Sequence, residues 1–138
     1  MVTAYDVDAN KLIDKVAEKL KVAKVEKPAF IGLVKTGSHA ERPPDSGDFW
    51  YVRCASILRQ IYVNSKAGTQ RLRRHYGGKK NRGVKPEKHA PSGGSTIRKA
   101  MQNLEKAGYL AKGEKEKGRV LTAKGRQLLD NAAKEVSG

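Results

Sequence analysis

The chain has 138 residues, the length of one domain, and a hydrophobic share of 38% that allows a single core. Its 29 Lys and Arg against 14 Asp and Glu give a formal net charge of +15, which favours a polyanionic partner, nucleic acid before an anionic membrane. No apolar run could cross a bilayer, the N-terminus lacks the apolar region of a signal peptide and a single Cys excludes an internal disulfide, so we expect a cytoplasmic protein.

The N-terminal part is expected to supply one structural helix followed by a loop. Residues 8 to 21 begin at Asp8, a candidate N-cap, and carry apolar side chains at helical spacing: Leu12, Ile13, Val16 and Leu20. Lys27-Pro28 ends this helix. The apolar run from 29 to 34 fits either a helical turn or a strand, and residues 35 to 47 contain the Gly and Pro breakers of a loop.

The stretch from 49 to 63, FWYVRCASILRQIYV, is expected to be the central helix. A helical projection gives it a broad apolar arc made of Trp50, Tyr51, Cys54, Ala55, Ile57, Leu58, Ile61 and Tyr62. The opposite side carries Arg53, Ser56, Arg59 and Gln60. A surface helix has a narrower stripe, so this helix should touch neighbours on most of its girth.

The middle of the chain is its most basic part. Residues 64 to 100 contain eleven Lys or Arg and one acid, Glu87, whereas an ordinary solvated face mixes both signs. After a turn at 64 to 68, residues 69 to 75 should form a short helix with Leu72 facing inward. Residues 76 to 94 are rich in Gly and Lys, and we expect an irregular loop that is functional or that a partner orders on binding.

The C-terminal part reads as a helix, a two-stranded wing and a second helix. From 95 to 107 the spacing i, i+3, i+4, i+7 marks a buried face made of Ile97, Ala100, Met101 and Leu104, and Gly108 should end the helix. Residues 109 to 112 and 119 to 121 are expected to pair as strands around a charged tip at 113 to 118. Thr122 should cap the last helix, which carries Leu128, Leu129, Ala132 and Ala133.

Together these elements predict a mainly α fold in one domain covering residues 1 to 138. The fold would be a helical bundle around the central helix, with a winged-helix-like part from about 49 to 135 and a short β-hairpin as its wing. Residues 95 to 107 would then occupy the position of the recognition helix. The segment Leu121-Thr122-x-x-Gly125 is common to many winged helices and to unrelated helix starts.

The start of the helix at 93 to 98 is a candidate phosphate site. Backbone N–H groups and the helix dipole favour an anion there, Gly93 and Gly94 allow a close approach, and Ser95, Thr96, Arg98 and Lys99 add hydroxyls and charge. An ordinary Gly-Ser helix cap is the alternative.

Arg53 and Arg59 border the polar side of the central helix, and each has two interpretations. They could contact RNA, or they could form internal ion pairs with an acid such as Asp45 or Glu41. Among the aromatic residues, Tyr76 beside Gly77-Gly78-Lys79-Lys80 is the candidate for stacking on a base, whereas Trp50 and Tyr62 are expected in the core.

The sequence does not predict catalysis, a metal site or a cofactor. His39, His75, His89 and Cys54 lack the spacing of metal ligands, and Gly77-Gly78-Lys79-Lys80 lacks the Ser or Thr of a phosphate-binding P-loop. Asp45 and Asp48 are explained by helix capping. We therefore expect a protein that is not an enzyme and that binds no metal.

Several long motifs resemble the nineteen-e family of small-ribosomal-subunit proteins from archaea and eukaryotes. They are DFWYVRCASILRQIY (48 to 62), RRHYGGKKNRGVKPEKHAPSGGSTIRKAMQNLEKAGYL (73 to 110), GRVLTAKGRQLLDNAA (118 to 133) and VKTGSHAERPP (34 to 44). Cys54 stands where a small apolar residue is usual, and Asn64-Ser65-Lys66 replaces a glycine-rich turn. The compact termini are similar to the archaeal form.

The resemblance implies a structural constituent of the ribosome that binds ribosomal RNA in the head of the small subunit. It also implies a role in maturing the precursor RNA, contact with neighbouring head proteins and a cytoplasmic location; the free protein would be a monomer that binds no membrane. Charge and resemblance together give fifteen candidate RNA-binding residues: Lys35, Arg53, Arg59, Arg71, Arg73, Arg74, Lys79, Lys80, Arg82, Lys85, Lys88, Ser95, Arg98, Lys99 and Arg119.

Two other functions compete with this one. A winged-helix transcription regulator would read DNA, but regulators usually dimerise and often carry an effector domain. An assembly factor would bind the subunit only transiently. The basic charge beyond the recognition helix argues against the regulator, and only the family resemblance separates a resident protein from an assembly factor.

Overall fold

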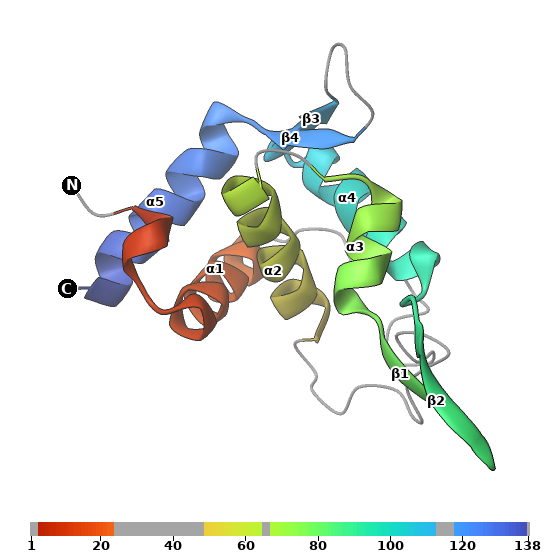
Figure 1. Cartoon of the computed structure of the whole chain (residues 1–138). Helices are drawn as coiled ribbons and strands as arrows, with labels where there is room; N and C mark the ends of the chain where they lie inside the picture. The colour runs from red at the N-terminus through yellow and green to blue at the C-terminus, as the bar shows by residue number, and fades with distance from the viewer. Residues whose placement is uncertain (1–2, 24–48, 65–66, 113–117, 138) are drawn as a thin grey trace.

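The computed structural model describes residues 3–23, 49–64, 67–112 and 118–137, and it is mostly helical (Figure 1). Its elements in chain order are η1 (Ala4–Asp6), α1 (Ala9–Val22), α2 (Phe49–Asn64), α3 (Thr69–Tyr76), β1 (Gly78–Arg82), β2 (Lys85–Ala90), α4 (Gly94–Lys106), β3 (Leu110–Lys112), β4 (Arg119–Leu121) and α5 (Ala123–Ser137). The expected mainly α fold with a winged-helix-like arrangement is confirmed. The expectations for residues 24–48 lie outside the described residues.

Helix α2 lies at the centre of the molecule, between α1 and α5 on one side and α4 with the wing on the other (Figure 1). No residue from Phe49 to Tyr62 is exposed, and Trp50, Cys54, Ile57, Leu58 and Ile61 are fully buried. The expectation that this helix touches neighbours on most of its girth is therefore confirmed. The broad apolar arc is the cause, because it lets one helix pack against several elements.

The other helices present single apolar stripes to α2. Helix α1 buries Leu12, Val16 and Leu20, α4 buries Ile97, Ala100, Met101 and Leu104, and α5 buries Leu129, Ala132 and Ala133. Leu72 of α3 is buried as its position in the sequence predicts. Each stripe follows the helical period, so the residues chosen from the sequence form the core.

The ends of two helices match the sequence signals. Gly108, with φ +90, follows α4, and the N–H groups of Gly108 and Tyr109 donate to the carbonyls of Glu105 and Leu104 at 3.1 and 3.0 Å. This is a Schellman cap, which needs a left-handed residue at that position. At the start of α5 the Thr122 hydroxyl accepts a hydrogen bond from the Gly125 N–H at 3.2 Å, which confirms Thr122 as the cap.

The wing is an antiparallel pair in which Leu110, Ala111 and Lys112 face Leu121, Val120 and Arg119. Ala67, between α2 and α3, adds an isolated bridge to Arg119, with N···O distances of 3.2 and 2.9 Å. The wing is thereby hydrogen-bonded to the turn that joins the first two helices of the winged-helix part.

The expectation of an irregular loop from 76 to 94 is wrong. Strands β1 and β2 form an antiparallel hairpin, here called the arm (Gly78–Ala90), which projects from the helical body beyond the end of α3 (Figure 1). Its two-residue loop begins at Gly83, whose φ of +74 suits a tight hairpin turn, and the Asn81 side chain accepts a hydrogen bond from the Gly83 N–H at 2.9 Å. The sequence does not predict the two strands of the arm, because every residue from Lys79 to His89 is exposed and no alternation of apolar and polar residues marks the strands.

Candidate nucleic-acid interface

One continuous part of the chain collects exposed positive charge. Within α3, the arm and the first half of α4, Glu87 is the one acid. We call this part the basic surface and define it by nine exposed cations: Arg71, Arg74, Lys79, Lys80, Arg82, Lys85, Lys88, Arg98 and Lys99. Ser95, which is also exposed, lies in the first turn of α4, just before Arg98 and Lys99 in the chain.

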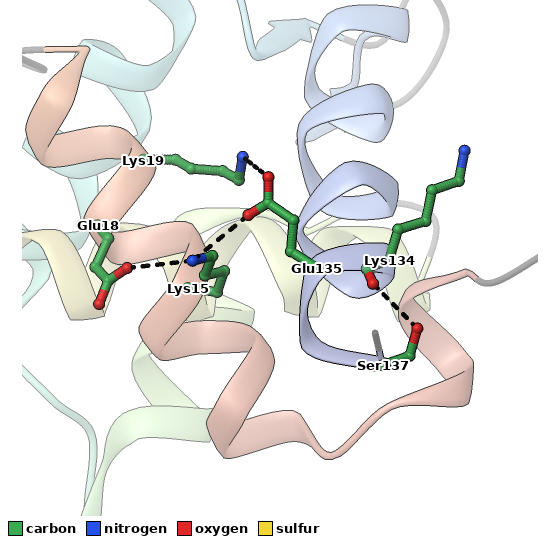
Figure 2. Close-up of polar contacts among 6 residues, drawn as sticks. All are labelled: Lys15, Glu18, Lys19, Lys134, Glu135 and Ser137. Atoms are coloured by element: carbon green, nitrogen blue, oxygen red, sulfur yellow. Dashed lines mark hydrogen bonds and ion pairs between the residues drawn. The ribbon is translucent and has the colours of Figure 1, made fainter.

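The cations of the basic surface form no ion pair with another described residue. The contact between α1 and α5 is different, as Figure 2 shows: Lys15 lies 3.7 Å from Glu18 and 3.6 Å from Glu135, and Lys19 lies 3.0 Å from Glu135. The hydrogen bond from Lys19, with the charges of both lysines, lowers the pKa of Glu135. Charges on the α1–α5 face thus neutralise one another, whereas those of the basic surface remain available to an external anion.

In the arm, like charges face each other across the strands. The register places Lys80 opposite Lys88 and Arg82 opposite Lys85. Directly opposed like charges destabilise an antiparallel pair. A two-stranded hairpin without a buried face is also only marginally stable in water. Binding of a polyanion would remove this repulsion.

The first turn of α4 keeps the features of an anion site. Gly93 is the N-cap and no side chain caps the helix. Thr96 is buried, so Ser95 is the hydroxyl exposed to a ligand. The side chain of Arg73 lies against Gly94, where a Cβ atom would be 3.3 Å from the Arg73 Cδ. Uncapped N–H groups next to Arg98 and Lys99 favour a phosphate at this position.

Three of the candidate cations donate hydrogen bonds within the protein. Arg82 does so inside the arm, from its Nε to the Pro86 carbonyl at 2.8 Å, and Arg73 and Arg119 do so in the helical body. Arg73 is half-buried, and its Nε donates to the Ser92 carbonyl at 2.9 Å. The Arg119 Nε lies 3.0 Å from Glu105 Oε2, which joins the wing to α4. The guanidinium groups of Arg73 and Arg119 therefore stabilise the fold. Their other N–H groups are the donors that remain for a ligand.

Arg53 and Arg59 are half-buried on α2, although the helical projection placed them on a polar side. The Arg53 guanidinium lies over the Tyr76 ring at 4.0 Å and over the Phe49 ring at 5.2 Å, and burial lowers its pKa. The Arg59 Nε is buried and has no hydrogen-bond partner among the described residues. The acids proposed as ion-pair partners, Asp45 and Glu41, lie outside the described residues, as does Lys35.

Tyr76 is held in place within the protein. Its hydroxyl is 2.6 Å from the Ser56 hydroxyl, one face of its ring is covered by Arg53, and His75 meets the ring edge-on at 4.8 Å. Sequence reasoning missed this cluster because Tyr76 is 20 residues from Ser56, and only the shared face of Arg53 and Ser56 on α2 hinted at it. Trp50 and Tyr62 are core residues, as expected.

The described residues offer no metal site, because no three His, Cys, Asp or Glu among them come together. Cys54 is buried, and burial raises the pKa of its thiol. None of the described helices combines the length and the apolar character that a membrane span requires.

Comparison with known proteins gives a consistent result. The model of the family described as ribosomal protein S19e matches residues 3–138. Small ribosomal subunit protein eS19 of the archaeon Aeropyrum pernix is 46% identical, over 99% of this chain and 90% of that protein. The eS19 protein of Emericella nidulans is 42% identical over 96% of this chain and 90% of its own length. The eS19A protein of Schizosaccharomyces pombe is 43% identical, with 96% and 92% covered.

Proposed function

Because the chain belongs to the ribosomal protein S19e family, and so has a structural role in the small ribosomal subunit, we propose that it binds ribosomal RNA through its basic surface. The RNA is that of the small-subunit head, and the same contacts form on its precursor and support maturation and assembly. The protein would act on the cytoplasmic ribosome beside other head proteins, and enter it as a monomer.

The observation that carries the proposal is the pairing of like charges in the arm. Lys80 opposes Lys88, and Arg82 opposes Lys85, on strands that bury nothing. Such an arrangement costs stability in the free protein. It is explained by a partner whose phosphates lie along both strands and neutralise them.

Fourteen of the fifteen candidate residues, all but Arg53, divide into three groups under this proposal. The nine cations of the basic surface contact phosphates. One of these phosphates lies at the start of α4, where Ser95, Arg98 and the backbone N–H groups of the first turn donate hydrogen bonds to it. Arg73 and Arg119 support the surface from inside the fold. Arg59 is proposed as an RNA contact at the edge of α2, and Lys35 remains a proposal outside the described residues.

Binding should be driven mainly by phosphate contacts, so affinity should fall steeply with salt. The test compares two double variants that remove the same charge. Lys79→Gln with Lys80→Gln changes the arm, and Lys11→Gln with Lys134→Gln changes exposed lysines of α1 and α5. Affinity for a fragment of small-subunit RNA is measured over a range of salt concentrations.

The arm variant should bind more weakly and with a salt slope lower by about two contacts, roughly 1.4 to 1.8 in log–log units. The α1–α5 variant should lose little affinity. Equal losses in both variants would show that net charge alone attracts the RNA, and the proposed surface would be wrong.

A gradient of cell extract at moderate and high salt separates the functions that compete. Co-sedimentation with mature small subunits supports a resident ribosomal protein, and co-sedimentation with precursors alone would indicate an assembly factor. Free protein carrying promoter DNA would indicate a transcription regulator, an alternative that the comparisons do not support.

A further inference from the structure

The direction of the arm is determined at its base. From Lys79 to His89 every residue is exposed, so among the described residues no packing contact along the arm holds it against the body. Strand β2 has six residues and spans about 20 Å, so a rotation of roughly 10° at the base would move the tip by about 3 Å. A displacement of that size is enough to break the hydrogen bonds of a phosphate contact.

One side of the base is fixed through Tyr76, the last residue of α3, which Gly77 joins to β1. The Tyr76 hydroxyl lies 2.6 Å from the Ser56 hydroxyl, and the Arg53 guanidinium lies 4.0 Å above the ring centre. Arg53 and Ser56 both belong to α2, the central helix. The start of the arm is thus attached to the most buried element of the fold.

The other side of the base is fixed through the segment after β2. The Ser92 N–H donates to the Arg73 carbonyl at 2.9 Å, and the Arg73 Nε returns a bond to the Ser92 carbonyl at 2.9 Å. Gly77 passes so close to this segment that a Cβ atom on it would clash with the Ala90 carbonyl oxygen. This side is held by one backbone hydrogen bond and one bond from the Arg73 side chain, whereas the Tyr76 side depends on two side chains of α2.

We propose that Arg53 is a positioning residue for RNA binding: by stacking on Tyr76 it sets the direction in which the arm leaves the body. It acts on RNA through the arm and needs no phosphate of its own. The proposal rests on the function proposed above, and it gives Arg53 a role that neither a phosphate contact nor an internal ion pair would give.

The environment of Arg53 supports positioning over direct contact. Its guanidinium is half-buried between two aromatic rings, Phe49 and Tyr76, and has lost much of its hydration. The nine cations of the basic surface are exposed and lack aromatic partners among the described residues. A planar guanidinium is the side chain that stacks best on an aromatic ring, and lysine would not replace it.

The first measurement uses the protein without RNA, so it does not depend on the function proposed above. Spin labels are attached through Val84→Cys at the tip of the arm and Asn131→Cys on the exposed side of α5. The native Cys54 is fully buried and should not react in the folded protein. Distance distributions are recorded for the labelled parent and for Arg53→Met, Arg53→Lys and Arg71→Met.

Arg53→Met should broaden or shift the tip distance by several Å, on the scale of the lever estimated above. Arg53→Lys should lie closer to Arg53→Met than to the parent, because the positive charge alone does not restore the stack. Arg71→Met, which removes an exposed charge from α3, should leave the distribution unchanged. A distribution identical to the parent in Arg53→Met would overturn the proposal.

The second measurement is RNA affinity against salt. If only a fraction of arms points correctly, the apparent dissociation constant rises by the inverse of that fraction, while the bound complex keeps all its phosphate contacts. Arg53→Met should therefore bind about fivefold more weakly, as for the loss of one partly buried cation–π contact, with an unchanged salt slope. Arg71→Met should lower the slope by about 0.7 to 0.9. A lower slope in Arg53→Met would show that Arg53 contacts a phosphate directly.

A double-mutant cycle with Tyr76→Leu completes the test. If Arg53 acts through Tyr76, the losses of affinity in the two single variants should not add in the double variant. Additive losses would contradict the proposal. Where Tyr76→Leu fails to fold, Tyr76→Met takes its place in the cycle, because it too removes the ring on which Arg53 stacks. Absence of RNA binding by the wild-type protein would refute the proposed function, and the label distances would still decide the role of Arg53.

Discussion

The Tyr62 hydroxyl donates a hydrogen bond to the Asp130 carboxylate at 2.9 Å, and this bond joins the central helix α2 to α5. The guanidinium of Arg126 lies 5.0 Å from the centre of the Tyr62 ring. The Tyr5 ring packs against the Tyr62 ring, with 5.1 Å between the ring centres. Tyr62 is buried and Asp130 half-buried. One tyrosine therefore connects η1, α2 and α5.

Tyr62→Phe should lower the free energy of unfolding by about 1 kcal/mol, because Asp130 then loses its donor while the ring stays in place. Urea unfolding measures the difference. Tyr5→Phe is the matched control, because the Tyr5 hydroxyl donates at 3.2 Å to the Tyr62 carbonyl from an exposed position and its loss should cost less. A larger loss in the control would contradict the role given to Asp130.

Tyr76 should make stability depend on alkaline pH. Burial raises its pKa, against the opposing effects of the Ser56 hydrogen bond and the Arg53 charge. Above about pH 10 the unfolded chain loses the tyrosine proton while the folded protein keeps it, so stability falls as pH rises until the folded pKa is passed. Tyr76→Phe should lose less stability than wild type between about pH 9 and 11.

The control for this pH effect is Arg53→Met. Removing the cation that favours tyrosinate should raise the pKa of Tyr76 further, which the tyrosinate absorbance of the folded protein reports. A titration of Tyr76 that is the same in both proteins would mean that Arg53 does not stack on the ring in solution.

Gly125→Ala should destabilise the protein by about 1 to 3 kcal/mol. A Cβ atom there would lie 2.5 Å from the Tyr109 carbonyl oxygen and 3.1 Å from Leu121 Cδ1, so α5 and the wing would have to separate. Gly68→Ala is the control, because its Cβ would lie 3.9 Å from the nearest atom. Thermal unfolding of the two variants compares them, and equal melting temperatures would count against the close contact.

Arg98→Glu should weaken RNA binding and lower the salt slope by about one contact, because Arg98 lies exposed in the second turn of α4 beside the proposed phosphate position. Lys11→Glu, an equal charge reversal on α1, should change both quantities much less. If affinity and salt slope are unchanged in Arg98→Glu, the proposed phosphate site at the start of α4 is wrong.

Arg59→Met should keep the stability of the protein, or raise it by up to about 1 kcal/mol, because it removes a buried donor that has no partner in the described part of the chain. RNA affinity should nevertheless fall if Arg59 offers its outer N–H groups to RNA. A clear loss of stability would instead indicate an internal ion pair, so urea unfolding and RNA binding of this one variant separate the two roles.

Local patterns were sufficient to predict the helices. Leu12, Leu72, Ile97 and Leu129 are all buried because each belongs to an apolar stripe whose period matches the helix. Gly108 and Thr122 ended and started helices as expected, because caps are decided within a few residues. The breadth of the apolar arc of α2 was enough to predict a central helix.

Two features could not be read from local patterns. The strands of the arm carry cations on both faces, so only Asn81 and Gly83, flanked by segments of similar length, signalled a hairpin. The stacking of Arg53 on Tyr76 joins residues that are distant in sequence, and a helical projection shows only that Arg53 lies on the polar side of its helix. In both cases the structure depends on contacts between residues that are not neighbours in the sequence. Composition shows how much charge a segment carries, but it does not show which residues the charged groups contact.

Because the arm buries no side chain, substitutions in the arm and substitutions in the core should cause different defects. A substitution between Lys79 and His89 removes no core contact, so it should leave the folded population, and hence the amount of protein in the cell, nearly unchanged. A substitution of a fully buried residue of α2, such as Ile57 or Leu58, should instead reduce that amount, because folding itself depends on these side chains. Under the proposed function, a defect in the arm would therefore appear as normal levels of a protein that is missing from its subunits, whereas a defect in the buried face of α2 would appear as a shortage of the protein.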